Sequence, residues 1–180
     1  MRRLAGAALI ALVAGPCGVL LRAEFPQRDA VLSAAFVFNF AKYTDWPNLA
    51  DDAPIVACVF RDDAMAAALS DTVRGQKISE HSINVRVSKD QDGLRLCHLL
   101  FVGAADTRPS QSALAAISAL PVLTVSDSAG FARAGGIIEM YVEDGRIHFA
   151  INVTAIERSG LHLSPRLLNL ARIVRGPHAP

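Results

Sequence analysis

Strand-like and helix-like segments alternate through the first two thirds of the chain, and this alternation restricts the possible folds more than any other feature. Short runs of β-branched and other apolar residues are typical of buried strands, whereas longer segments with apolar residues three and four positions apart are typical of helices. We expect strands at 55–60, 83–87, 96–102 and 122–125, and helices at 29–43, 64–73 and 109–117. Such alternation indicates largely parallel strands with helices on both faces of the sheet.

The last third of the chain departs from this pattern. Segments 137–142 and 147–151 flank an Asp-Gly pair, which favours the tight turn of an antiparallel hairpin. Segment 164–174 begins with Ser-Pro, an N-cap residue followed by proline at the first helical position, and we expect it to form a final helix. The sequence therefore predicts an α/β fold in a single domain, with a mixed β-sheet covered by helices on both faces.

Residues 1–23 have the three-part layout of a secretory signal. Two arginines follow the first methionine, an uncharged apolar stretch comes next, and Ala23 supplies a small residue for cleavage. A membrane anchor is one alternative, but Pro16 interrupts a stretch that is short for a spanning helix of about 20 residues. A lipoprotein signal acylated at Cys17 is another, and Pro16 disfavours it. We expect a cleaved export signal and an exported domain at 24–180.

Removal of the predicted signal changes the charge of the protein. The precursor carries a net charge of +1, and the exported domain keeps 15 basic and 17 acidic residues, which gives −2. Its lysines and arginines form no basic run. Because binding to phosphate backbones requires clustered basic side chains, we expect no nucleic-acid partner.

Two cysteines, Cys58 and Cys97, remain after signal cleavage, and both lie in segments expected to be strands. Two cysteines in an exported protein most often form one disulfide. Neighbouring strands would bring the two sulfur atoms together. Two buried free thiols are the alternative, favoured if residues 1–23 are not an export signal.

No catalytic or metal-binding motif stands out. The five histidines lack the spacing of metal ligands, and both a glycine-rich phosphate loop and a Gly-x-Ser-x-Gly motif are missing. We expect no catalytic residue, no metal and no cofactor. An exported enzyme whose residues converge only in space is the competing hypothesis.

A group of polar residues in the second half of the chain is the candidate ligand site. An arginine near a helix N-terminus suits an anion or a carboxylate, and the end of a buried strand is a frequent ligand position in α/β sheets. The candidates are Ser126, Arg146, Asn152, Ser164 and Arg166. The alternative is a structural polar cluster that fixes the last helix against the sheet.

The expected helix at 29–43 has apolar residues on two faces and no continuous polar face. Such a helix is either buried or covered by a partner. We expect Phe36, Phe40, Tyr43 or Trp46 to contribute to a dimer or partner surface, the alternative being that all four belong to the core. Under the interface hypothesis, a charged residue at position 40 breaks association and leaves the fold intact.

Taken together, several segments resemble the YfiR family. They are 34–43 with Trp46-Pro47, 97–102, 123–127, the segment 131–138 with its Gly-Gly pair, 145–152, and 160–168. The resemblance covers nearly all of the exported domain, in order. It implies a periplasmic regulator that represses a membrane-bound diguanylate cyclase through contact with the periplasmic region of the cyclase. Such repression restrains cyclic-di-GMP signalling and biofilm formation.

The resemblance also implies a homodimer, and Cys58 and Cys97 match one disulfide of the family. A second disulfide, near the hairpin in some members, has no cysteines here. The alternative function is a periplasmic small-ligand sensor that binds an anionic or aromatic ligand near Arg166.

Overall fold

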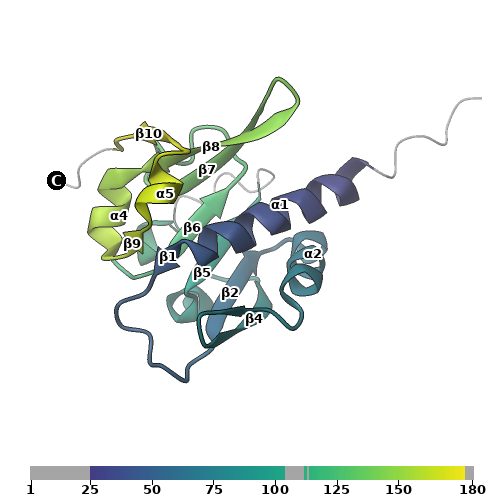
Figure 1. The fold of residues 1–180 in the computed structure, drawn as a ribbon, viewed down its shortest axis with the longest axis vertical. Helices are drawn as coiled ribbons and strands as arrows, with labels where there is room; N and C mark the ends of the chain where they lie inside the picture. Colours follow the sequence, from purple (N-terminus) through teal and green to yellow (C-terminus); the bar gives the residue numbers. More distant parts are fainter. Residues whose placement is uncertain (1–24, 104–111, 113, 177–180) are drawn as a thin grey trace, which may run out of the picture.

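The computed structural model describes residues 25–103, 112 and 114–176, with only the backbone described for 25–29 (Figure 1). The expected export signal and the start of the helix expected at 109–117 lie outside these residues. The strands of the main sheet are β2 (Ile55–Phe60), β3 (Lys77–Ile78), β4 (His81–Ser88), β5 (Leu99–Val102), β6 (Leu123–Ser126), β7 (Ile138–Glu143), β8 (Arg146–Asn152) and β10 (Arg172–Val174). The helices are α1 (Phe25–Lys42), α2 (Asp63–Val73), the 3₁₀ helix η1 (Asp92–Leu96), α4 (Val153–Ser159) and α5 (Pro165–Leu168).

The main sheet has the strand order β10-β8-β7-β6-β5-β2-β4-β3. Strands β4, β2, β5, β6 and β7 run parallel, β8 is antiparallel to β7, β10 is parallel to β8, and β3 is antiparallel to β4. A separate antiparallel pair joins β1 (Thr44–Asp45) to β9 (His162–Leu163). The predicted α/β fold with a mixed sheet is confirmed.

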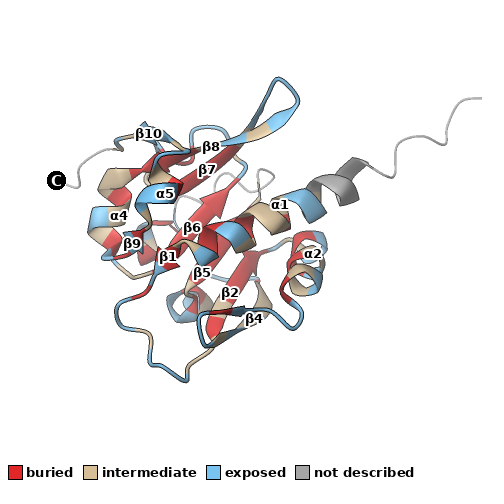
Figure 2. Cartoon of the chain, viewed as in Figure 1, coloured by how far each residue is buried: buried red, intermediate tan, exposed pale blue. Residues whose placement is uncertain are grey.

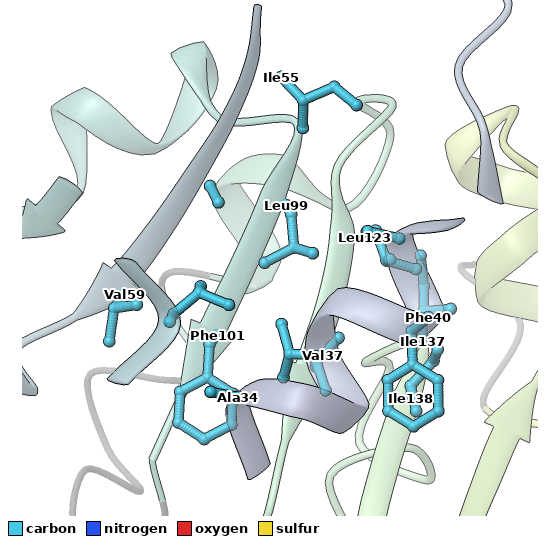
Figure 3. Close-up of a cluster of buried hydrophobic side chains, with 14 of the residues drawn as sticks. Ala34, Val37, Phe40, Ile55, Val59, Leu99, Phe101, Leu123, Ile137 and Ile138 are labelled. Carbon is cyan, nitrogen blue, oxygen red and sulfur yellow. The ribbon is translucent and has the colours of Figure 1, made fainter. Parts of the chain in front are cut away.

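Helical segments cover both faces of the sheet, as expected. On one face, α1 and α2 pack over the central strands, and Ala34, Val37 and Phe40 of α1 point into a core built on the sheet (Figures 1 and 3). On the other face, a second apolar cluster joins η1 and the helical residues 114–117 to strands β2 and β5. The central strands are consequently buried from both sides (Figure 2).

The β7–β8 hairpin has the turn that its sequence predicts. Asp144 and Gly145 both have positive φ angles, 51° and 70°, which is the backbone of a type I′ turn. Glu143 lies opposite Arg146 at the end of the ladder. The hairpin extends past the body of the sheet, along the N-terminal half of α1 (Figure 1).

Several elements differ from the sequence-based expectation. The helix expected at 29–43 begins earlier, at Phe25, and the strand expected at 96–102 begins at Leu99, because η1 occupies the residues before it. The final helix is also shorter than expected: α5 ends at Leu168, and residues 172–174 form β10. Residues 172–174 pair with the outer edge of β8 and satisfy the backbone N–H and C=O groups there. If the helix continued instead, these groups of β8 would have no strand partner. Helix α4, capped by the side chain of Asn152, was not expected.

The two cysteines form a disulfide. Cys58 lies in β2 and Cys97 lies two residues before β5, so neighbouring parallel strands place their Cα atoms 5.9 Å apart. The half-buried guanidinium of Arg86 in β4 lies beside the bond: Nε donates to Sγ of Cys58 at 3.2 Å and Nη2 donates to the carbonyl of Gly93 at 2.6 Å. The sequence-based pairing of the two cysteines agrees with the structure.

The ring of His98 is a half-buried acceptor directly before β5, which makes the stability of the fold pH-dependent. Its Nδ1 accepts a hydrogen bond from the amide of Val56 at 2.9 Å. Burial, and secondarily the nearby His81, lower the pKa of His98 below 6.5. The unfolded chain therefore takes up a proton at a higher pH than the folded protein does. We expect the free energy of unfolding to fall as the pH drops below about 6.5, until the folded-state pKa is reached.

Urea unfolding of the variant His98→Asn between pH 7.5 and 5.0 measures this effect. Asparagine keeps an acceptor near the position of Nδ1 but does not titrate, so the loss of stability on acidification should be smaller than in the wild type. The exposed His148, changed to asparagine, is the control and should retain the wild-type pH profile. Equal pH profiles for His98→Asn and the wild type would contradict the assignment.

Candidate interaction surface

A groove lies between α1 and the β7–β8 hairpin. It has a volume of about 390 Å³ and is lined mainly by apolar side chains, with Arg146 at the hairpin turn. Leu32 and Ser33 form its α1 wall, while Val142 and Ile147 belong to its hairpin wall.

The α1 wall continues an apolar stripe that starts in the core. Leu32, Phe36 and Phe40 are four residues apart and so lie on one face of the helix. The ring of Phe40 packs edge-on against Phe149 of β8 at a centroid distance of 4.9 Å, and the ring of Phe36 follows at 6.0 Å from Phe40. One helix face is thus buried at its C-terminal end and reaches solvent at Leu32.

Two large apolar side chains that line the groove are exposed to solvent. Leu32 is 49% exposed and Val142 is 72% exposed. Single exposed apolar residues are ordinary, whereas two of them in one groove indicate an interaction surface. We call these two residues, together with Ile147, the α1–hairpin surface.

The residues expected at an interface lie elsewhere. Phe40 and Trp46 are only 1% and 6% exposed, so the expectation that they form a surface is corrected. Trp46 also donates its indole N–H to the carbonyl of His98 at 3.0 Å. Phe36 and Tyr43 are half-buried against the same core. The physical reason is that α1 packs against both the sheet and α2, so both of its apolar stripes find cover within the chain.

The polar residues expected to bind a ligand do not form one site. Arg146 and Asn152 are the first and last residues of β8 and lie at opposite ends of that strand. The Ser126 hydroxyl is buried and accepts from the amide of Ser128 at 2.9 Å. Ser164 caps the four-residue helix α5, from which Arg166 points to solvent. The ligand-site expectation is corrected in favour of separate structural roles.

Asn152 is the clearest of these structural roles. Its buried Oδ1 accepts from the amide of Ala155, which starts α4, and from the amide of Gly176, each at 3.1 Å. Its Nδ2 donates to the carbonyl of Ala132 at 2.6 Å. One side chain thus joins the end of β8 to Gly176 and to the loop before β7, and both of its polar atoms have partners within the chain.

Metal-ion sites and membrane-spanning helices are not found among the described residues. Within 25–103 and 112–176, apart from residue 113, no three histidine, cysteine or acidic side chains are grouped so that they could hold a metal ion. In the same part of the chain, no helix combines the length and the apolar character that crossing a membrane requires.

Comparison with known proteins supports the fold and identifies the family. A crystal structure of a conserved domain protein from Vibrio cholerae O1 biovar El Tor matches with a TM-score of 0.51 and 11% sequence identity, which shows a shared fold. The match covers 78% of this chain and 59% of that protein, so this chain spans well under two thirds of it. A family model described as YfiR/HmsC-like matches residues 30–172, which include both cysteines, the hairpin and β10 up to its first residue. This chain belongs to the YfiR/HmsC-like family.

Proposed function

We propose that this protein represses a membrane-bound diguanylate cyclase by direct contact with the periplasmic region of the cyclase, and thereby restrains cyclic-di-GMP signalling and biofilm formation. Membership of the YfiR/HmsC-like family supports a periplasmic regulator of diguanylate cyclase signalling in general. The observation that carries the contact mechanism is the α1–hairpin surface, with its two exposed apolar side chains that line a groove.

The composition of the groove suits a protein partner. It is lined by leucine, methionine, valine and isoleucine side chains and by Tyr141, together with the polar side chains of Ser33, Asp127 and Arg146. Apolar and aromatic side chains beside an arginine are typical of the central part of protein–protein interfaces.

The disulfide supports the proposed compartment. Structural disulfides persist in oxidising compartments such as the bacterial periplasm and are rare in the cytosol. Cys58 and Cys97 are bonded and buried in the centre of the domain. We propose residues 1–23 as the cleaved signal that exports this domain, and we infer a regulatory rather than a catalytic role.

Charged substitutions on the α1–hairpin surface test the proposal. We expect Leu32→Asp and Val142→Asp each to weaken binding to the purified periplasmic region of the cyclase by about tenfold or more, because each buries a carboxylate in an apolar contact. Titration calorimetry with the oxidised protein measures the affinity. Both side chains are exposed, so the stability of the fold should change little.

Leu96→Asp is the matched control. Leu96 is also an exposed leucine, but it lies in η1 and therefore on the opposite face of the sheet from α1. Its substitution should leave the affinity unchanged. If the wild-type protein does not bind the cyclase at all, the proposed function is wrong. If it binds and all three variants bind equally well, repression uses another surface.

A further inference from the structure

Positive charge gathers at the C-terminal end of this chain. Residues 24–157 contain 11 basic and all 17 acidic residues of the exported domain, which gives a net charge of −6. Residues 158–180 contain four arginines and no acidic residue, which gives +4. Such a difference between two parts of one small domain is typical of proteins that bind an anionic partner through the basic part.

Three of the four arginines flank one outer edge of the main sheet. Arg172 begins β10, the strand at this edge, Arg175 directly follows the strand, and Arg166 lies in α5 just before it (Figure 1). All three side chains are exposed, and the guanidinium of Arg172 lies 4.3 Å from the ring centroid of Tyr141. None of the ion pairs among the described residues includes one of these arginines. Within that part of the chain, no acid therefore compensates their charge.

Two large apolar side chains are exposed among these arginines. Leu170 is 72% exposed and Ile173 is 45% exposed, as the pale blue of this segment in Figure 2 shows. The amide of Leu170 donates to the carbonyl of Leu167, so the helical turn continues past α5. Arg166 and Leu170, four residues apart, therefore lie on one side of that turn. Ile173 and Arg175, two residues apart at the end of the strand, share a face.

We call Arg166, Leu170, Arg172, Ile173 and Arg175 the C-terminal edge surface. Exposed apolar side chains that insert among lipid headgroups, beside arginines that bind the lipid phosphates, are typical of surfaces that bind anionic membranes. The apolar stems of the arginines also pack against lipid while their guanidinium groups stay in water. An acid, which an anionic bilayer repels, is missing from the whole of 158–180.

The composition of this surface suits a lipid more than a protein partner. The residues that dominate protein–protein contacts are mainly tryptophan, tyrosine and arginine, and leucine is under-represented among them. Segment 164–176 contains no aromatic and no acidic residue. The α1–hairpin groove, by contrast, is lined by both Tyr141 and Asp127. Charge of a single sign beside exposed aliphatic side chains therefore favours a bilayer surface here.

We propose that the C-terminal edge surface binds the surface of an anionic phospholipid bilayer. The edge of the sheet faces the headgroups, Leu170 and Ile173 insert between them, and the three arginines bind phosphate groups. Each arginine near such a surface should raise the partition constant about fivefold at low salt, and three together about 100-fold. The binding is reversible. No residue of this surface belongs to the α1–hairpin surface, and the inference does not depend on the proposed function.

Co-sedimentation of the oxidised exported protein with lipid vesicles, over a series of lipid concentrations, tests the proposal. The wild type should bind vesicles that contain phosphatidylglycerol but not vesicles of phosphatidylcholine alone, and high salt should release it. The triple variant Arg166→Gln/Arg172→Gln/Arg175→Gln should bind about 100-fold more weakly. The same three positions changed to lysine keep the charge and should keep most of the binding. Leu170→Gln/Ile173→Gln should bind about tenfold more weakly, because less apolar surface enters the headgroup region.

Arg95→Gln and Leu96→Gln in η1 are the matched controls. Leu96 is 67% exposed beside an exposed arginine, but the exposed Asp90 and Asp92 flank this pair in the sequence. Both substitutions should leave vesicle binding unchanged. All substituted side chains are exposed, so each variant should keep the circular dichroism of the wild type.

Three results would overturn the proposal. They are a wild type that does not bind phosphatidylglycerol vesicles, equal binding to both kinds of vesicle, and a triple glutamine variant that binds as well as the wild type. If the wild type ignores vesicles and the triple glutamine variant loses affinity for the cyclase, the surface contacts a protein instead. Vesicle binding is measured without the cyclase, so its failure leaves the proposed function to the calorimetric titration.

Discussion

Loss of the Cys58–Cys97 disulfide should lower the free energy of unfolding by about 4 kcal/mol. The bond closes a loop between residues 39 positions apart, and the chain-entropy model assigns a constraint of that size on the unfolded chain. It also ties β2 to the start of β5 at the centre of the sheet, where both sulfur atoms are buried. Since domains of this size are stable by about 5–15 kcal/mol, the loss would remove a large part of the total.

Urea unfolding of the oxidised wild type and of the double variant Cys58→Ala/Cys97→Ala measures this difference. The reduced wild type is the matched control, because it loses the same constraint and keeps both sulfur atoms. It should unfold at a urea concentration close to that of the double variant. If the double variant instead unfolds at the same concentration as the oxidised wild type, the bond does not constrain the unfolded chain.

The parts of the fold that the sequence predicted are those with a local cause. Segment 55–60 is apolar on both faces because helices cover both sides of β2, and that burial is visible in its composition. The Asp-Gly pair fixes the β7–β8 turn because both residues adopt positive φ angles. The cysteine pairing followed from the export signal together with two neighbouring strand segments.

The parts that the sequence did not predict depend on tertiary packing. Segment 164–174 begins as a helix, but its last residues form β10 because they pair with the edge of β8. Asn152 looked like a ligand-site residue because a buried polar side chain and a binding side chain have the same sequence signature. The Asn-Val-Thr-Ala sequence at 152–155 does contain the N-cap signal of α4, and that signal could have identified its role.

The misplacement of the interface has a similar cause. Two apolar stripes on one helix indicate two covered faces, but the sequence does not say whether the second cover comes from the same chain. Here α2 provides it, and α1 makes many contacts with both α2 and the core of the sheet. Only the N-terminal part of the apolar stripe that includes Leu32 extends beyond the residues that cover α1, and Leu32 is exposed there. An interaction surface on this helix stays a prediction, and the proposed α1–hairpin surface places it at the N-terminal part of the stripe.

Phe40 allows the two interpretations of α1 to be separated by experiment. Its ring is buried between α1 and β8, against Phe149, in the cluster that also includes Val37 and Ile138 (Figure 3). Truncation of a buried phenylalanine removes its transfer free energy and leaves a cavity, so Phe40→Ala should cost about 3–5 kcal/mol in urea unfolding. Phe40→Asp places an unpaired carboxylate in the same cavity and should prevent folding at neutral pH.

Leu32→Asp is the matched control on the same helix face, two turns closer to the N-terminus. Because Leu32 is half exposed, its carboxylate stays in water, and the unfolding midpoint should remain near that of the wild type. The interface hypothesis predicts the opposite result: the Phe40→Asp variant folds but no longer binds its partner. A Phe40→Asp protein with wild-type circular dichroism and wild-type stability would therefore show that Phe40 lies at the surface. An unfolded Phe40→Asp protein together with a folded Leu32→Asp protein would show that the core ends between these two residues.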